Sequence, residues 1–95
     1  MGMIETTVDI PAEHQANVFG QFDAFAKKIE RTLHVTLIAR DDTVKILGEE
    51  TVALQAKSVL EQLTALARRG NQIQEQNVNY TLALSMDQSE GKVLE

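Results

Sequence analysis

This sequence of 95 residues has no cysteine and no tryptophan, a single proline, and only three phenylalanines and one tyrosine. Without cysteine the chain can form no disulfide and no thiolate metal site, which fits a reducing cytoplasm. Basic residues are also scarce, since 9 Lys and Arg face 14 Asp and Glu for a net charge of −5. An autonomous nucleic-acid binder is usually basic, because Lys and Arg must neutralise phosphates. The charge therefore argues against strong unaided binding to nucleic acid.

Long apolar runs are missing as well. No stretch approaches the roughly 20 apolar residues that span a bilayer, and no signal-peptide pattern opens the chain. We therefore expect a cytoplasmic protein without a membrane partner.

Catalytic and phosphate-binding motifs are absent from the sequence. His14 is predicted on an exposed helix and His34 on an open sheet face, and neither has a paired nucleophile. A Walker A motif needs a glycine five residues before its Gly-Lys pair and Ser or Thr after it. Around Gly91-Lys92 these positions hold Met86 and Val93. The sequence predicts no catalytic, cofactor-binding or metal-binding residue in this chain.

What the chain does have is a clear alternation of apolar and polar residues in three segments. Residues 4–10, 33–39 and 44–47 follow the period of two that is typical of half-buried strands. Pro11 ends the first strand, and Gly48 is expected to break the third. The turn Arg40-Asp41-Asp42-Thr43 between the others is interpreted as a solvated hairpin turn, because Asp is a preferred turn residue and two neighbours supply too few oxygens for a cation.

Four segments follow the helical period instead: residues 12–18, 22–32, 49–69 and 75–86. The second carries an apolar stripe on Phe22, Phe25, Ala26 and Ile29. The third is predicted to bury Leu60 and Leu63 against the sheet and to stop at Gly70.

This order predicts an α+β fold, with a three-stranded antiparallel sheet covered on one face by helices and an extra C-terminal helix. The β-α-α-β-β-α core resembles a two-layer KH domain of type I. Residues 4–86 are expected to form this domain. Residues 1–3 are interpreted as a leader and 87–95 as a linker or tail, with vector origin considered for residues 1–2 and 94–95.

KH domains hold single-stranded nucleic acid across a Gly-x-x-Gly loop. Here Gly20 occupies the first glycine position, but Asp23 occupies the second and brings a negative charge and a Cβ. The residues that can contact a nucleic acid are Gly20, Gln21, Lys27, Lys28 and Arg31. The alternative interpretation is that Gly20 only joins two helices and that Asp23 is the N-cap of the second.

A closer resemblance covers residues 4–86. The segments that carry it are Phe19-Gly20, residues 33–40 (LHVTLIAR), residues 44–49 (VKILGE), residues 59–63 (VLEQL), Arg68-Arg69-Gly70 and Val78-Asn79-Tyr80. Their order resembles the N-terminal domain of PhoH-family proteins, which are bacterial P-loop ATPases.

The resemblance implies that this chain is a fragment whose ATPase domain follows, and that ATP and Mg²⁺ are bound there. Two functions stay open. The first is an accessory module that guides single-stranded RNA to that ATPase domain. The second is a docking or oligomerisation domain that binds no nucleic acid. The expected partners are the chain's own ATPase domain, single-stranded RNA under the first hypothesis, and further copies assembled through the full-length protein.

Overall fold

The computed structural model describes residues 2–90 and the side chains of residues 2–86. The elements are β1 (Met3–Asp9), α1 (Ala12–Phe19), a single 3₁₀ turn (Gln21–Asp23), α2 (Ala24–Leu33), β2 (Thr36–Arg40), β3 (Thr43–Glu49), α3 (Glu50–Arg68) and α4 (Glu75–Glu90). The sheet has the order β1-β3-β2, and both pairs of strands are antiparallel. The predicted α+β fold, with its β-α-α-β-β-α core and a further C-terminal helix, is confirmed.

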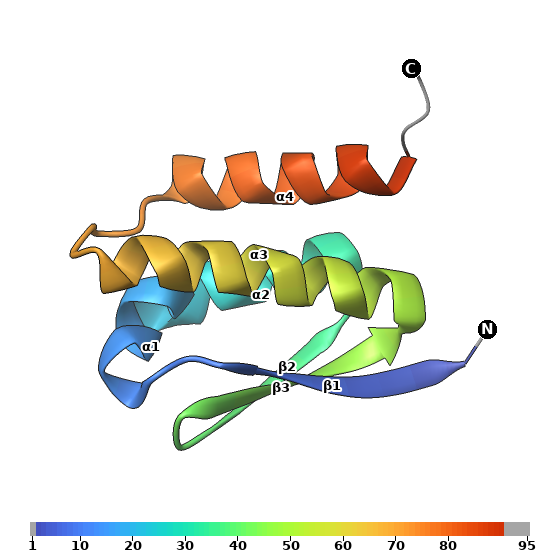
Figure 1. Ribbon diagram of the computed structural model, residues 1–95, viewed down its shortest axis with the longest axis horizontal. Helices are drawn as coiled ribbons and strands as arrows, with labels where there is room; N and C mark the ends of the chain where they lie inside the picture. The colour runs from blue at the N-terminus through green and yellow to red at the C-terminus, as the bar shows by residue number, and fades with distance from the viewer. Residues whose placement is uncertain (1, 91–95) are drawn as a thin grey trace.

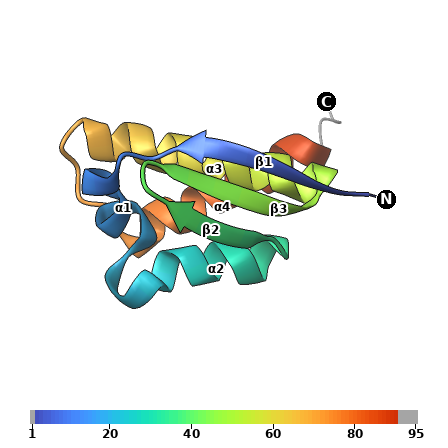
Figure 2. The same cartoon turned by 90° about the horizontal axis from the view of Figure 1, so that it is seen from below.

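The helices α1, α2 and α3 cover one face of the sheet, and α4 lies over α3 on the side away from the strands (Figure 1). Seen from below, α2 runs alongside β2, while β1 forms the other edge of the sheet (Figure 2). The core lies between the sheet and the helices. Its largest fully buried side chains include Ile10, Ile29, Ile46, Leu60 and Leu63. The predicted burial of the two leucines of α3 is therefore confirmed.

The second strand begins later than the sequence pattern predicts. Leu33 is the last residue of α2, and His34 ends that helix in the left-handed region, with φ 59°. His34 was expected on the open sheet face, and that prediction is wrong. Leu33 and Val35 alternate with His34 as in a strand because both are buried against the core, although neither lies in β2.

Gly48 was expected to break the third strand, but it lies inside β3 and pairs with Ile4. A Cβ at Gly48 would come within 2.8 Å of Val35 Cγ1. The glycine therefore allows the loop after α2 to pack directly on the sheet, and the strand continues to Glu49.

The C-terminal helix is longer than predicted, because α4 continues from residue 86 to Glu90. Residues 87–90, which were interpreted as the start of a linker or tail, are helical. Met3, assigned to a leader, is the first residue of β1. Met1, the rest of that tail and the pair Gly91-Lys92 lie outside the described residues.

Candidate nucleic-acid interface

The loop that resembles Gly-x-x-Gly begins where α1 ends. The Gly20 N–H donates to the Ala16 carbonyl at 3.0 Å, and Gly20 has φ +82°. A Cβ there would lie 2.7 Å from Cδ2 of Phe25. Glycine is therefore required at position 20 both by the backbone conformation and by the ring that packs against it.

Phe22 and Asp23, the next residues of this loop, also have positive φ values of 56° and 60°. The left-handed region costs a residue other than glycine roughly 1–2 kcal/mol. Phe22 is 85% exposed, so its predicted place in the buried stripe of α2 is wrong. The stripe begins at Phe25, because the chain turns left-handed before α2 starts and carries Phe22 away from the core.

Asp23 does occupy the N-cap position of α2, as one of the two interpretations predicts. Its side chain makes no capping hydrogen bond, however, because the residue is left-handed rather than extended. The Asp23 N–H donates to the Gly20 carbonyl at 3.0 Å, which closes the turn. Asp23 therefore has a backbone conformation that favours glycine and a carboxylate that is not engaged as a helix cap.

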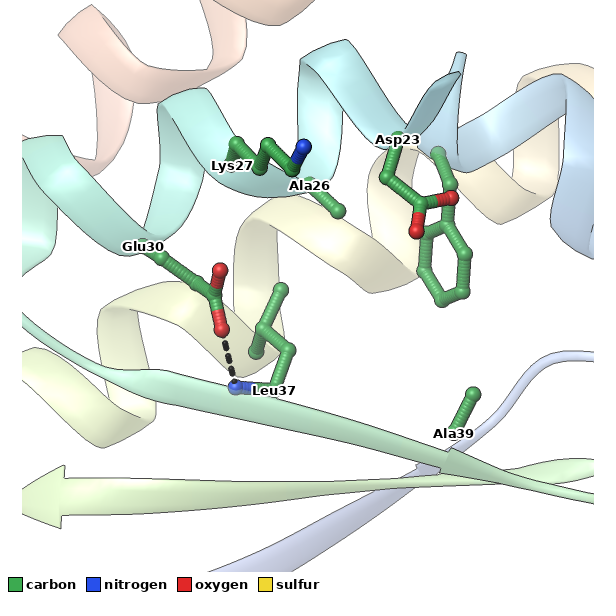
Figure 3. A pocket seen from close by; sticks show the side chains of 7 residues that line it. Asp23, Ala26, Lys27, Glu30, Leu37 and Ala39 are labelled. Atoms are coloured by element: carbon green, nitrogen blue, oxygen red, sulfur yellow. Dashed lines mark hydrogen bonds between the residues drawn. The ribbon is translucent and has the colours of Figure 1, made fainter. Parts of the chain in front are cut away.

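A hollow of about 140 Å³ opens next to this loop, between α2 and β2. Figure 3 shows Asp23, Lys27 and Glu30 on its helical wall, with Leu37 and Ala39 on the strand side. Phe19 and Ala26 complete the lining. The hollow thus combines an apolar surface with two carboxylates and one ammonium group.

Glu30 closes part of the strand edge that borders this hollow. Its Oε2 accepts a hydrogen bond from the Leu37 N–H at 2.9 Å (Figure 3). The Leu37 N–H therefore points away from β3, and the alternation of an antiparallel strand directs the N–H and C=O of Ala39 the same way. Ala39 presents these backbone groups along the edge of the hollow.

The structure brings only some of the predicted contact residues together. Gly20 and Gln21 form the loop, and Lys27 lines the hollow. Lys28 instead forms an ion pair with Glu75 at the start of α4, with Nζ and Oε2 3.2 Å apart. Arg31 is exposed one turn further along α2. Lys27 is thus the basic residue that the hollow includes.

Glu30, Leu37 and Ala39 were not among the sequence-predicted contact residues. The sequence contains one indication that Glu30 lies near Lys27. Glu30 follows Ala26 and Lys27 at spacings of four and three, which places it on the same face of the helix. Leu37 and Ala39 also alternate on the face that the helices cover. Their position beside α2 depends on tertiary packing, which no local pattern encodes.

The two aspartates of the hairpin turn have a structural role that the sequence analysis missed. Asp42 Oδ1 accepts from the Ala12 N–H at 2.7 Å, and the Asp42 carbonyl accepts from the Ile10 N–H at 2.9 Å. Gln15 Nε2 donates to the carbonyls of Asp41 and Ile10. The turn is therefore not merely solvated, because Asp42 satisfies the first turn of α1, where Pro11 has no side-chain acceptor.

His14 lies in α1, with its Nε2 3.5 Å from Glu13 Oε2. Among the described residues, no three His, Cys, Asp or Glu side chains come together as a metal site. Between residues 2 and 90, no helix has the length and apolar character needed to cross a bilayer.

These features define an α+β domain whose strand order and helices are consistent with a small KH-like fold, with a hollow beside its helix-helix loop. In sequence, the chain is 32% identical over 69 residues to a PhoH-like protein of Bacillus subtilis (strain 168). It is 25% identical over 81 residues to PhoH-like proteins of Mycobacterium bovis and Mycobacterium tuberculosis. The matches cover 73% and 85% of the chain, and they relate it to PhoH-like proteins.

The chain spans only 22% and 23% of the length of these relatives. The similarity therefore concerns less than a quarter of each relative. No family model matches the chain. A crystal structure of a protein of unknown function from Aeropyrum pernix has the same fold, with a TM-score of 0.72 at 15% identity. That match covers 94% of this chain and 50% of the other.

Proposed function

We propose that this chain is an accessory domain of a PhoH-like ATP-binding protein and that it holds single-stranded RNA for a downstream ATPase domain. The observation that carries the proposal is the hollow between α2 and β2, which lies beside the Gly20 loop and contains Lys27. The relation to PhoH-like proteins and the KH-like fold support it. A cytoplasmic location is part of the same proposal.

The hollow has the mixed chemistry that a nucleotide requires. The apolar side chains of Phe19, Ala26 and Leu37 offer a surface for the face of a base, and the N–H and C=O of Ala39 offer a donor and an acceptor for its edge. Lys27 offers a positive charge to the backbone phosphate. RNA recognition of this kind depends on splayed, unstacked bases, so a single strand is the expected form of the ligand.

The charges around the hollow predict weak binding. Asp23 and Glu30 place two carboxylates near the one ammonium group of Lys27, and the whole chain is acidic. Phosphate contacts through a single lysine release few counterions, so the affinity has a shallow dependence on salt. The domain on this proposal orients RNA, while the rest of the PhoH-like protein supplies most of the affinity.

ATP and Mg²⁺ belong to the remainder of the protein under this proposal. The chain has no Walker A spacing, and its Gly91-Lys92 pair is followed by valine rather than Ser or Thr. The proposal therefore assigns neither the binding of a nucleoside triphosphate nor any step of ATP hydrolysis to the residues of this chain.

Fluorescence anisotropy with short single-stranded RNA at low salt tests the proposal. Lys27→Glu is expected to remove the binding, because it adds a third carboxylate to the hollow. Lys57→Glu on α3 is the matched control, since it makes the same charge reversal outside the hollow and is expected to weaken binding much less. Equal losses in both variants, or no binding by the unchanged chain at low salt, would contradict RNA binding at this hollow.

A second candidate function is that of a docking domain that binds no RNA. The observation that supports it is the exposure of Phe22. Phe22 is 85% exposed and has a left-handed backbone, and residues with a strained backbone often lie at contact sites. The partner on this hypothesis is the ATPase domain of the same protein. Phe22→Ala in the full-length protein would then weaken the contact between the two domains, and limited proteolysis would cleave the chain between them faster. RNA binding would be unaffected.

A further inference from the structure

The two edge strands of the sheet, β2 and β1, have different surroundings. At the β2 edge, α2 runs alongside the strand, and the Leu37 N–H donates a hydrogen bond to the carboxylate of Glu30. At the other edge, β1 is a strand of seven residues, Met3–Asp9, without a helix beside it in the sheet plane (Figure 2). Edge strands with unpaired backbone groups are ready to pair with a further strand.

The direction of the backbone groups in β1 follows from one hydrogen bond. The Ile10 N–H donates to the Asp42 carbonyl at 2.9 Å, which continues the β1–β3 register by one residue. In an antiparallel pair, the residues that bond to the neighbour alternate along the strand. Ile4, Thr6 and Val8 therefore bond to β3, and the N–H and C=O groups of Glu5 and Thr7 point outward from the sheet.

We propose that two copies of this chain pair through their β1 edges, antiparallel, with a two-fold axis at Thr6. In this register Glu5 of each copy lies opposite Thr7 of the other, and such a pair of outward residues exchanges two backbone hydrogen bonds. The two three-stranded sheets would then form one continuous sheet. A two-fold interface uses the same surface on both copies, so the strand must be complementary to itself.

The distribution of charge along β1 favours this register. A shift that placed Thr7 on the axis would set Glu5 opposite Asp9 of the second copy, and like charges directly opposite each other are destabilising. With Thr6 on the axis, Glu5 faces a threonine and Asp9 faces Met3, which is 75% exposed. In this register no carboxylate of the strand lies directly opposite a carboxylate of the other copy.

A second hollow lies on the surface above the β1 edge. It has a volume of about 270 Å³ and lies between Val8 and Asp9 of β1 and the α3 residues Glu61, Thr64, Ala65 and Arg68. The proposed register places Ile4 of the second copy opposite Val8, at this hollow. Leu54, which is 49% exposed, shares the α3 face of Glu61 and Ala65 by its spacing of seven and eleven residues. In the proposed dimer, the two-fold axis brings Leu54 of the second copy towards the hollow of the first.

A crosslinking experiment tests the register, and the absence of native cysteine makes it simple to interpret. Residues opposite each other in a non-hydrogen-bonded pair have Cα atoms about 4.5 Å apart, which is within the range of a disulfide. Thr6→Cys is expected to form a covalent dimer on mild oxidation of the full chain. Thr36→Cys, exposed on β2, is the control and is expected to form much less.

Charge substitutions at Thr7 test the same interface without a crosslink. Thr7→Glu would face Glu5 of the second copy and is expected to weaken the dimer more than Thr7→Lys, which would face the same carboxylate but also Lys45 of its own copy. Sedimentation over a range of concentrations measures both, with Thr36→Glu and Thr36→Lys as controls. A chain that stays monomeric, equal crosslinking at positions 6 and 36, or Thr7 variants that do not differ would each overturn the proposal.

Discussion

The carboxylate of Glu30 on α2 accepts a hydrogen bond from the backbone N–H of Leu37 on β2, with a distance of 2.9 Å. This bond joins the helix to the edge of the sheet and forms one side of the hollow beside the Gly20 loop. Glu30 therefore has two opposed effects. It satisfies a backbone donor of the strand, and it adds a negative charge to the hollow, which under the proposed function opposes the approach of a phosphate.

Substitutions at Glu30 separate these effects. Glu30→Ala is expected to lower the free energy of unfolding by about 1–3 kcal/mol, because the Leu37 N–H loses its acceptor in a partly buried position. Glu30→Gln keeps an acceptor oxygen and is expected to cost less. Both remove a negative charge, so both should strengthen binding of single-stranded RNA if the proposed function is correct. Urea denaturation and anisotropy titration measure the two effects independently.

The control for Glu30→Gln is Glu13→Gln on α1, which removes the same charge from an exposed position outside both hollows. It should leave stability nearly unchanged and raise RNA affinity less. If the two variants gained equally, the effect would come from net charge rather than from the hollow.

The core of the domain depends on the buried face of α3. Leu60→Ala and Leu63→Ala are each expected to cost about 2–5 kcal/mol, because both side chains are fully buried and leave cavities. Leu54→Ala on the same helix is the control, since Leu54 is half exposed and should cost far less. Melting temperatures that fell equally for all three would show that burial does not determine the loss.

The contact between the hairpin turn and α1 makes a further prediction. Asp42→Ala removes the acceptor for the Ala12 N–H and is expected to cost about 0.5–2 kcal/mol, as the loss of a helix cap does. Asp42→Asn retains an acceptor oxygen and should cost less. Asp41→Asn is the control, because Asp41 contributes only its backbone carbonyl to the hydrogen bonds of this contact. A thermal melt that ranked Asp41→Asn below Asp42→Ala in stability would contradict this assignment.

The sequence predicted much of the fold because its periodicities are local. The stripe of α3 and the alternation in β1 follow directly from residues that face one core, and the pairing of β2 with β3 follows from the hairpin turn. The errors fall where local pattern and tertiary packing diverge. Leu33 and Val35 alternate like strand residues but are buried on either side of a helix cap, and Gly48 reads as a breaker although it accommodates Val35.

The candidate site was less predictable for the same reason. The Gly20 loop and Lys27 could be identified from the chain, because the loop resembles a known motif and the helix face is basic. The partners of Lys28 and Glu30 could not, since Glu75 and Leu37 reach them only through the packing of α4 and β2. The positive φ of Phe22 likewise depends on how α1 and α2 meet.

Asp23 offers the most direct test of the loop. It lies in the left-handed region without a capping hydrogen bond, and its carboxylate lines the hollow. Asp23→Gly removes both the charge and the Cβ, whereas Asp23→Ala removes the charge but keeps the Cβ. A left-handed backbone costs alanine roughly 1–2 kcal/mol. The free energy of unfolding of the glycine variant is therefore expected to be about 1 kcal/mol larger than that of the alanine variant.

The same two variants report on RNA. Both should bind single-stranded RNA more tightly than the unchanged chain at low salt, because a carboxylate has left the hollow, and the gain should shrink as salt rises. A larger gain for Asp23→Gly than for Asp23→Ala would indicate that the backbone of the loop itself approaches the phosphate. If anisotropy stayed flat for the unchanged chain and both variants while their melts differed as expected, the conformation of the loop would be confirmed. RNA binding by this domain would then be rejected in favour of docking.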